Sequence, residues 1–350
     1  MIEIRLKEKC GVQKAEMGRF SDRQAELQDY MKNAVLRFTG PVLSGGKKYY
    51  MNYYQAGKFI YRNARPLDLA RWKYLFEGGS REDVLTALAA YQNDDGGFGH
   101  ALEPDCWNPA SSPIQTWVAA EIIREIGLED KNHPVVQGIL QYLASGKDFD
   151  GHTWANTIAS NNDAPHAPWW EYASGAETSY NPTACLIAFI LKFSDPEGEL
   201  FSLACTLARE AYDYFKAHFP MESVGNVSCF VKLYDYLKES TADTLIDLTE
   251  FKTLLQRQIQ YVITYDTSKW AVEYVCKPSF FISSKASDFY EENREICEYE
   301  CEFIENTQEA DGTWAITWSW ADYEEEWSIS KNWWKSDWII KHLLYIKAMR

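Results

Sequence analysis

A short pattern that occurs twice, near opposite ends of the chain, constrains the fold more than any other feature. Residues 92–98 read Gln-Asn-Asp-Asp-Gly-Gly-Phe, and residues 308–314 read Gln-Glu-Ala-Asp-Gly-Thr-Trp. Both copies follow a segment with helical periodicity, and both fit Gln-x-x-Asp-Gly-x-aromatic. A repeated unit of helix and turn is typical of architectures that stack similar units against one another.

Each residue type in the pattern suits the joint between two helices. Glycine supplies a positive φ just past a helix end. Aspartate can accept hydrogen bonds from backbone amides of the turn. The aromatic side chain can pack under the turn, and the glutamine amide can bond neighbouring backbone. Asp95 and Asp311 are therefore poor candidates for catalysis, and the loops that follow the turns become the candidates instead.

The rest of the chain predicts helices and almost nothing extended. Ser80-Arg-Glu-Asp83 resembles a capping box and opens a predicted helix over 80–91. Only 269–275 suggests strands, as a short hairpin arm, and no strand–helix alternation occurs. The sequence therefore predicts an all-α protein. The other helices predicted around the turns cover 113–126, 134–144, 181–193, 286–306 and 333–348, and a reduced Asp-Gly-x-x-Trp copy lies at 150–154.

Composition narrows the classes of partner. With 14 Trp, 22 Tyr and 17 Phe, the chain can build a large core and still line a cavity. A net charge of −16 argues against nucleic acid or an anionic membrane surface as the main partner. No segment has 18 uncharged apolar residues, so no membrane span is expected.

Targeting and cysteine usage predict a cytoplasmic location. Residues 1–30 carry charges throughout and lack the apolar run of a secretory signal. The eight cysteines are scattered, as is typical of reduced thiols. Cys297 and Cys301 have helical spacing, but the sequence has no Cys-x-x-Cys and no histidine near them. We therefore expect neither a metal nor a cofactor.

The sequence predicts two parts of unequal length. Residues 1–48 are charged and end close to Gly40-Pro41 and Gly45-Gly46, which predicts an N-terminal helical extension. No Pro-rich or Ser-rich linker follows, so residues 49–350 are predicted to form a single domain. The sequence does not indicate the oligomeric state.

The turn pattern resembles the repeat of squalene–hopene and oxidosqualene cyclases. Residues 92–99, with Asp-Asp-Gly-Gly-Phe-Gly, are also similar to the repeat of protein prenyltransferase β subunits. The resemblance covers 80–127 and 300–348, and it covers 134–195 only through the order of helices. It implies an α/α toroid of paired inner and outer helices around a central cavity, and an isoprenoid or other hydrophobic small molecule as the ligand.

The catalytic motifs of that superfamily are missing. The Asp-x-Asp-Asp acid motif does not occur, and its nearest match, Asp148-Phe-Asp150, lies in the reduced turn. The Asp-x-Cys zinc motif is not matched either, since Asp105 and Cys106 are adjacent. The resemblance thus requires an atypical acid, for which Asp105 is the candidate.

The loop at 99–109 holds the first group of candidate residues. His100, Glu103, Asp105 and Trp107 bring an imidazole, two carboxylates and an indole within eight residues. A carboxylate pair beside an aromatic ring suits glycoside chemistry, in which one acid protonates and the other stabilises or activates water. The alternative is structural, with the carboxylates capping helices and His100 serving only the loop.

The loop at 156–181 holds the second group. It contains His166, Trp169, Trp170 and Glu171 and ends at Asn181. Long irregular loops in compact domains are uncommon and are often functional. Paired indoles suit sugar rings and polyprenyl chains equally. The alternative is a proline-stiffened lid packed on the main body.

The third segment, 314–334, is aromatic and acidic, and Trp318 and Trp320 could wall a cavity that favours a carbocation or a carbohydrate. We therefore predict His100, Glu103, Asp105, His166 and Glu171 as catalytic residues. The substrate would contact Trp107, Trp169, Trp170, Asn181, Trp318 and Trp320. Three functions remain open: an enzyme acting on a hydrophobic small molecule, a carbohydrate hydrolase or lyase, and a binding protein without catalysis.

Overall fold

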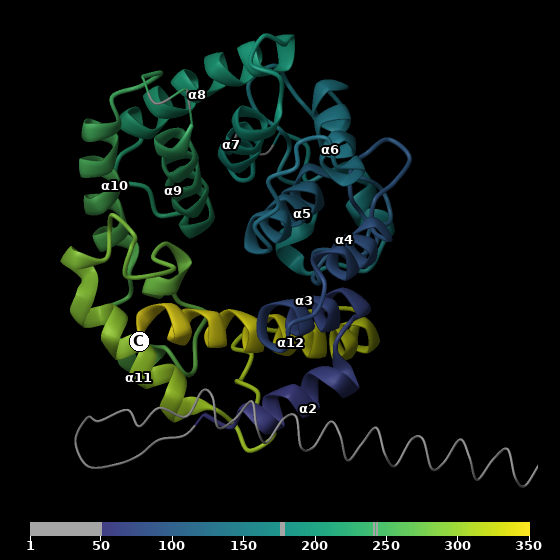
Figure 1. Cartoon of the computed structure of the whole chain (residues 1–350), viewed down its shortest axis with the longest axis vertical. Helices are drawn as coiled ribbons and strands as arrows, with labels where there is room; N and C mark the ends of the chain where they lie inside the picture. Colours follow the sequence, from purple (N-terminus) through teal and green to yellow (C-terminus); the bar gives the residue numbers. More distant parts are fainter. Residues whose placement is uncertain (1–50, 176–178, 241, 243) are drawn as a thin grey trace, which may run out of the picture.

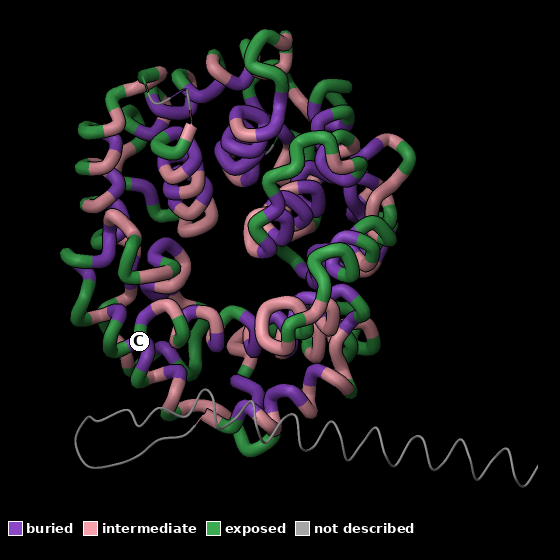
Figure 2. The backbone as a smooth tube through the Cα atoms, viewed as in Figure 1, coloured by how far each residue is buried: buried purple, intermediate pink, exposed green. Residues whose placement is uncertain are grey.

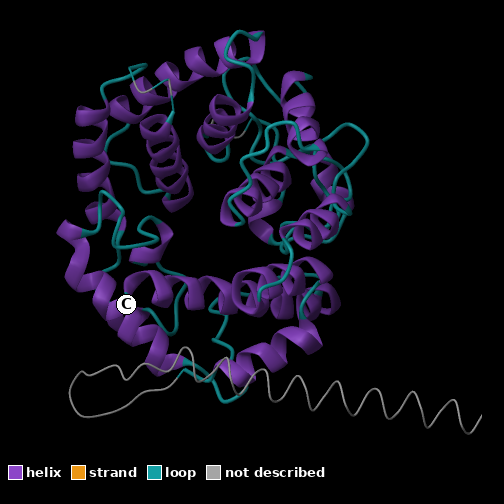
Figure 3. Cartoon of the chain, viewed as in Figure 1, coloured by secondary structure: helices purple, strands orange, loops and turns teal. Residues whose placement is uncertain are grey.

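The computed structural model describes residues 51–175, 179–240, 242 and 244–350. These residues form eleven α-helices and five short 3-10 helices, with no strand among them (Figure 3), which confirms the all-α prediction. The predicted extension over 1–48 lies outside the described residues. The α-helices are α2 (Tyr53–Asn63), α3 (Pro66–Glu77), α4 (Arg81–Ala89), α5 (Pro113–Glu125), α6 (Pro134–Ala144), α7 (Thr183–Phe193), α8 (Glu199–Ala217), α9 (Val224–Glu239), α10 (Leu248–Val262), α11 (Arg294–Thr307) and α12 (Glu324–Met349).

Local capping explains where several helices begin. The Ser80 hydroxyl accepts a hydrogen bond from the amide of Glu82, so α4 begins where the capping pattern predicts. Ser112 caps α5 in the same way, and Pro113 occupies its first position, where no amide donor is needed. Gly78 ends α3 with a φ of 72°, a conformation that glycine adopts without a steric cost.

Two helix boundaries and one extended segment differ from the sequence prediction. Helix α11 begins at Arg294, not near 286, because a 3-10 turn and serine-rich bends precede it. Helix α12 begins at Glu324, nine residues before the predicted start, with three glutamates in its first turn facing the positive end of the helix dipole. The hairpin arm predicted at 269–275 is wrong: Trp270 is buried and its indole donates to the Thr264 carbonyl at 2.7 Å, which folds the segment back on itself.

The two Gln-x-x-Asp-Gly-x-aromatic turns have the same internal bonds. Gln92 Nε2 donates to the Gly96 carbonyl at 2.9 Å, and Gln308 Nε2 donates to the Gly312 carbonyl at 3.0 Å. Both glycines have a φ of 87°. In each turn the aspartate accepts from the amide two residues later at 3.0 Å, so the predicted structural role of the motif aspartate is confirmed.

Each turn packs on the first residues of another helix. Gln92 Nε2 also donates to the Val135 carbonyl at 3.2 Å, at the start of α6. Gln308 Oε1 accepts from the Asn52 amide at 2.6 Å, at the start of α2. A methyl group on Gly96 would overlap the backbone of α6, and one on Gly312 would overlap the backbone of α2. The second turn therefore joins the end of the described chain to its beginning.

The reduced third copy keeps one tertiary bond of the full motif. The amide of Trp154 donates to Thr183 Oγ1 in α7 at 2.9 Å, as the amide of Phe98 donates to Thr116 Oγ1 in α5 at 3.1 Å. A methyl group on Gly151, by contrast, would meet nothing within 4 Å. The third turn thus holds its own following helix without packing against another helix start.

The helices follow one another around the molecule, and α12 returns beside α2 and α3 (Figure 1). A buried ion-pair network holds this return. Arg71 of α3 donates to Asp68 at 3.0 Å, to Glu125 of α5 at 2.7 Å and to Asp337 of α12 at 2.9 Å. Because Arg71 is the shared partner, α3, α5 and α12 are held at one point.

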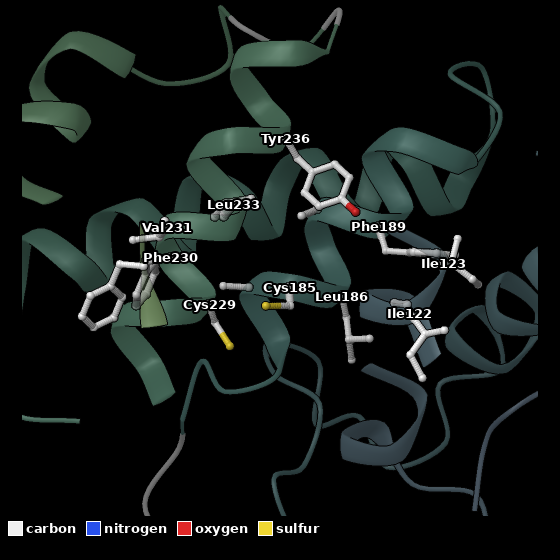
Figure 4. Packing of buried hydrophobic residues seen from close by; sticks show 14 of the residues in the cluster. Ile122, Ile123, Cys185, Leu186, Phe189, Cys229, Phe230, Val231, Leu233 and Tyr236 are labelled. Atoms are coloured by element: carbon white, nitrogen blue, oxygen red, sulfur yellow. The ribbon is translucent and has the colours of Figure 1, made fainter. Parts of the chain in front are cut away.

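The hydrophobic core is thickest around α7. All of its residues except Lys192 are buried, so protein surrounds α7 on every side (Figure 2). It packs against α5, α8 and α9. The packed side chains in Figure 4 include Ile122 and Ile123 of α5, Leu186 and Phe189 of α7, and Leu233 and Tyr236 of α9.

Candidate functional site

The Asp105 carboxyl is held by two tryptophans from the other end of the chain. The indole N–H groups of Trp320 and Trp334 donate to Asp105 Oδ1 at 2.8 and 2.7 Å. Asp105 is only 2% exposed, and burial raises the pKa of its carboxyl to about 6, although the indole hydrogen bonds act in the opposite direction. The indole of Trp318 also lies close enough to the carboxyl to lower its pKa. Neither Trp320 nor Trp334 bonds the other oxygen, Oδ2, which is therefore the oxygen that can carry a proton.

Glu103 is a second buried carboxyl beside Asp105. Its Oε2 accepts a hydrogen bond from the Asp105 amide at 2.7 Å. Burial, followed by the neighbouring Asp105 carboxylate, raises the pKa of Glu103 well above its usual range. Both carboxyls of the pair thus have a raised pKa, and that of Asp105 is about 6.

Hydrogen bonds to Arg65 and to α5 hold the loop that carries this pair. Arg65 donates to the carbonyls of Ala101 and Leu102 at 2.8 and 3.0 Å and is itself paired with Asp68. Gln115 of α5 accepts from the Leu102 amide at 2.9 Å. These buried partners hold the backbone before Glu103 in place.

His100 lies at the entrance of this loop and faces the turn. It is exposed, has a φ of 59°, and its Nε2 lies 2.8 Å from Asn93 Oδ1. The structure thus gives His100 a bond within the turn and none to Glu103 or Asp105.

Trp107 links the loop to α12. Its ring stacks on Trp333 with 5.2 Å between ring centroids, and its indole donates to Ser330 Oγ at 2.8 Å. The Ser330 hydroxyl donates in turn to the Pro104 carbonyl at 2.7 Å. Residues on both sides of Asp105 are therefore fastened to the same helix.

The second predicted loop lies beside the first. The Ala167 amide donates to the Asp105 carbonyl at 2.8 Å, and the Trp107 amide donates to the Pro165 carbonyl at 2.9 Å. His166 is buried, and its Nδ1 lies 2.7 Å from the Ala164 carbonyl. Its Nε2 lies 3.4 Å from Glu171, whose side chain is mostly exposed. The structure thus brings His166 next to the loop of the acid pair, with Glu171 outside it.

The remaining predicted residues of this loop lie in different surroundings. Trp169 is 46% exposed at the surface. Trp170 is half-buried, and its indole lies close enough to the Glu103 carboxyl to lower the pKa of that group. Asn181 lies at the start of α7, where its carbonyl accepts from Asn156 and its side chain lies 3.5 Å from Cys229 Sγ. Asn181 therefore belongs to the α7–α9 packing and makes no contact with the acid pair.

Trp318 extends the aromatic surface from Asp105 toward Trp338. Its ring centroid lies 5.4 Å from that of Trp334 and 5.5 Å from that of Trp338. Beyond Trp338 lies a pocket of about 50 Å³. Its lining residues are Trp270, Ala271, Lys277, Phe303, Thr307, Trp314, Ala315, Thr317, Trp338 and His342.

Sequence reasoning missed the α12 residues of this site. Ser330, Trp334, Trp338 and His342 are spaced by four, so they lie along one face of a helix. Three of the four were within the predicted helix over 333–348, and the spacing alone would have grouped them. Ser330 lies before the predicted helix and joins this face only because α12 begins at Glu324.

The described residues contain no cluster of three or more His, Cys, Asp or Glu side chains able to hold a metal ion. Within that same part of the chain, no helix has both the length and the apolar character needed to cross a membrane. No protein-family model matches the chain, and no curated protein or solved structure shows significant similarity to it.

Proposed function

We propose that this protein is an α/α toroid enzyme that protonates a hydrophobic small molecule, with Asp105 as the proton donor. One observation carries the proposal: a buried carboxyl with a pKa of about 6 whose Oδ1 is held by two indole N–H groups in an aromatic surrounding. A general acid works best when its pKa lies close to the working pH. Asp105 meets that condition without a metal-binding motif.

The toroid arrangement is supported by how the repeated turns meet. The loop after the first turn provides Asp105, and the loop after the second provides Trp320, 215 positions later in the chain. The second turn packs on α2, as the first packs on α6. Equivalent loops of a closed helical ring converge in this way, so the acid would sit where the ring's loops border its centre.

The proposed chemistry follows from the two oxygens of Asp105. The Oδ2–H bond breaks as its proton goes to an alkene carbon; the π electron pair forms the new C–H bond and a cation remains on the substrate. The two indole donors stabilise the carboxylate left behind. The ring faces of the neighbouring tryptophans, such as Trp318, favour a nearby cation.

The test is turnover of a panel of linear polyprenes and polyprenyl diphosphates, followed by product analysis. We expect Asp105→Asn to lose activity by about 10²–10⁴-fold, the range for removing a general acid, and the wild-type rate to fall as pH rises above about 6. Trp169→Phe, at the exposed indole, is the control and should keep full activity. Equal turnover by wild type and Asp105→Asn would remove the proposal. Binding without turnover in both proteins would favour the non-catalytic alternative.

The unequal acid pair favours a second function, carbohydrate hydrolysis or lysis. Burial raises the pKa of Glu103 well above its usual range and that of Asp105 to about 6, and a carboxyl pair of unequal pKa can supply an acid and a base or nucleophile. A glycan array and a hydrolysis screen decide between the two functions. Activity lost in both Glu103→Gln and Asp105→Asn would support the glycan function, whereas an empty array would exclude it.

A further inference from the structure

The pocket beyond Trp338 contains a buried lysine that forms no ion pair within the described part of the chain. Lys277 is 7% exposed. Its ammonium lies over the rings of Phe303 at 5.5 Å and Trp338 at 5.4 Å, and it forms no ion pair with a carboxylate in the described part of the chain. Glu300 is close enough to raise the pKa of Lys277, but burial dominates and lowers it. An ammonium buried in this way is costly unless a counterion joins it.

The charged neighbours of Lys277 are already engaged. Glu300, the acid that acts on Lys277, accepts from the Ser279 amide at 2.8 Å and from its hydroxyl at 2.6 Å. Asp337, whose charge acts on His342, pairs with Arg71 and with Lys341, at 2.9 and 2.7 Å. The acids that act on Lys277 and His342 thus have other partners.

Two more polar groups in the same pocket lack partners. The Nδ1 atom of His342 and the Oγ1 atom of Thr317 are buried and form no hydrogen bond among the described residues. The His342 ring packs on Trp314 and Trp338. Burial, followed by the charge of Lys277, lowers the pKa of His342 to about 3, so its ring is neutral and carries one N–H donor. An ammonium, an imidazole and a hydroxyl thus line one small space.

The size of the pocket selects the ligand. One water-sized atom needs about 10–15 Å³ of such space, so 50 Å³ holds about three or four heavy atoms. A carboxylate has three, whereas a diphosphate has nine. Trp338 leads from the pocket to Trp318 and on to Trp334, which offers an apolar surface for a tail running toward Asp105.

We propose that this pocket binds the carboxylate of a monocarboxylic acid with an apolar tail, with Lys277 as the counterion and Thr317 and His342 as neutral donors. This inference deepens the proposed function, because it names the ligand class of the same aromatic surface. Only the reaction of the tail at Asp105 rests on that function. Binding itself does not.

The experiment is titration calorimetry with octanoate, octanol and octylamine as probes. Octanoate should bind to the wild type most tightly, because only it supplies a negative charge. Lys277→Met keeps the length of the side chain and removes the charge, so it should weaken octanoate about 10–100-fold and leave octanol unchanged. Lys285→Met, at an exposed lysine, is the matched control and should bind octanoate as the wild type does.

Chain length and two further variants complete the test. From butyrate to octanoate the affinity should rise about fourfold per methylene that contacts the protein. Thr317→Val should weaken octanoate by about tenfold or less, which tests the pocket independently if Lys277→Met fails to fold by circular dichroism. Asp105→Asn should bind octanoate as the wild type does. Unchanged octanoate binding by this variant, whatever its turnover of polyprenes, separates the binding proposal from the proposed function. Equal affinity for octanoate and octanol, or octanoate binding unchanged in both Lys277→Met and Thr317→Val, would overturn the inference.

Discussion

The turns at 92–98 and 308–314 share their internal bonds and differ in what they join. The first packs on α6, the helix that comes next but one in the chain, whereas the second packs on α2, with 256 positions between Gln308 and Asn52. The same local device thus serves once as a joint between nearby helices and once as the closure between the two ends. The loops that follow the two turns then meet at Asp105. The comparison teaches that a repeated turn can be structural in itself and still determine which loops come together.

The largest expected effect comes from filling the space under the turns. Gly96→Ala and Gly312→Ala each require a left-handed non-glycine residue and overlap a neighbouring helix backbone. Together these costs amount to about 2–5 kcal/mol of unfolding free energy, measured by urea denaturation. Gly151→Ala in the third turn is the control: its φ is 101°, but the space around it is open, so only about 1–2 kcal/mol is expected. Equal losses at all three positions would contradict the packing difference.

The next effect lies where the two loops meet. The pKa of Asp105 is raised from 3.8 to about 6 on folding, so the native state holds the proton more tightly than the unfolded state. Wild-type stability is therefore reduced above pH 6, and the reduction disappears as pH falls through 6 toward 4. Asp105→Asn keeps the acceptor for both indoles and has no charge. It should be more stable than the wild type by about 2–3 kcal/mol at pH 8 and equally stable near pH 4, in denaturation series at each pH. A difference that does not change with pH would contradict this reading.

A smaller effect is expected from the motif glutamines. Gln92→Ala and Gln308→Ala each remove two hydrogen bonds, at a cost of about 1–2 kcal/mol. The two losses should agree although one turn joins near neighbours and the other joins the chain ends. Gln308→Glu keeps the acceptor for the Asn52 amide and loses the donor to Gly312, so it should show about half the loss. A loss of unfolding free energy in Gln308→Ala without one in Gln92→Ala would show that the two turns contribute unequally to stability.

The smallest effect concerns a difference between the turn aspartates. Asp95 pairs with Lys147 at 2.9 Å, with both side chains more than a third exposed, whereas Asp311 bonds the Thr313 hydroxyl instead. Lys147→Met should therefore cost no more than about 1 kcal/mol, and the loss should shrink further in 1 M salt. A larger, salt-independent loss would show that the ion pair holds the first turn.

Much of the fold could be predicted because its signals are local. Ser80, Ser112 and Gly78 act on amides within a few residues, so caps and ends are visible in the sequence. The boundaries of α11 and α12 could not be predicted as well, since a helix end is also decided by what packs beside it. The acid pair was predicted from its loop, whereas Trp334 and Ser330 were not, because Trp334 reaches Asp105 and Ser330 reaches Pro104 from more than 220 positions away.

The sequence by itself determined the helical class, the turns and the loop that carries Glu103 and Asp105, because helix periodicity and turn chemistry act over a few residues. Only the tertiary structure decided that indoles from the far end would hold Asp105 and that Lys277 would be buried with no ion pair among the described residues. The physical reason is burial. The pKa of a carboxyl and the cost of an unpaired ammonium depend on what surrounds them, and that surrounding is assembled from segments distant in sequence.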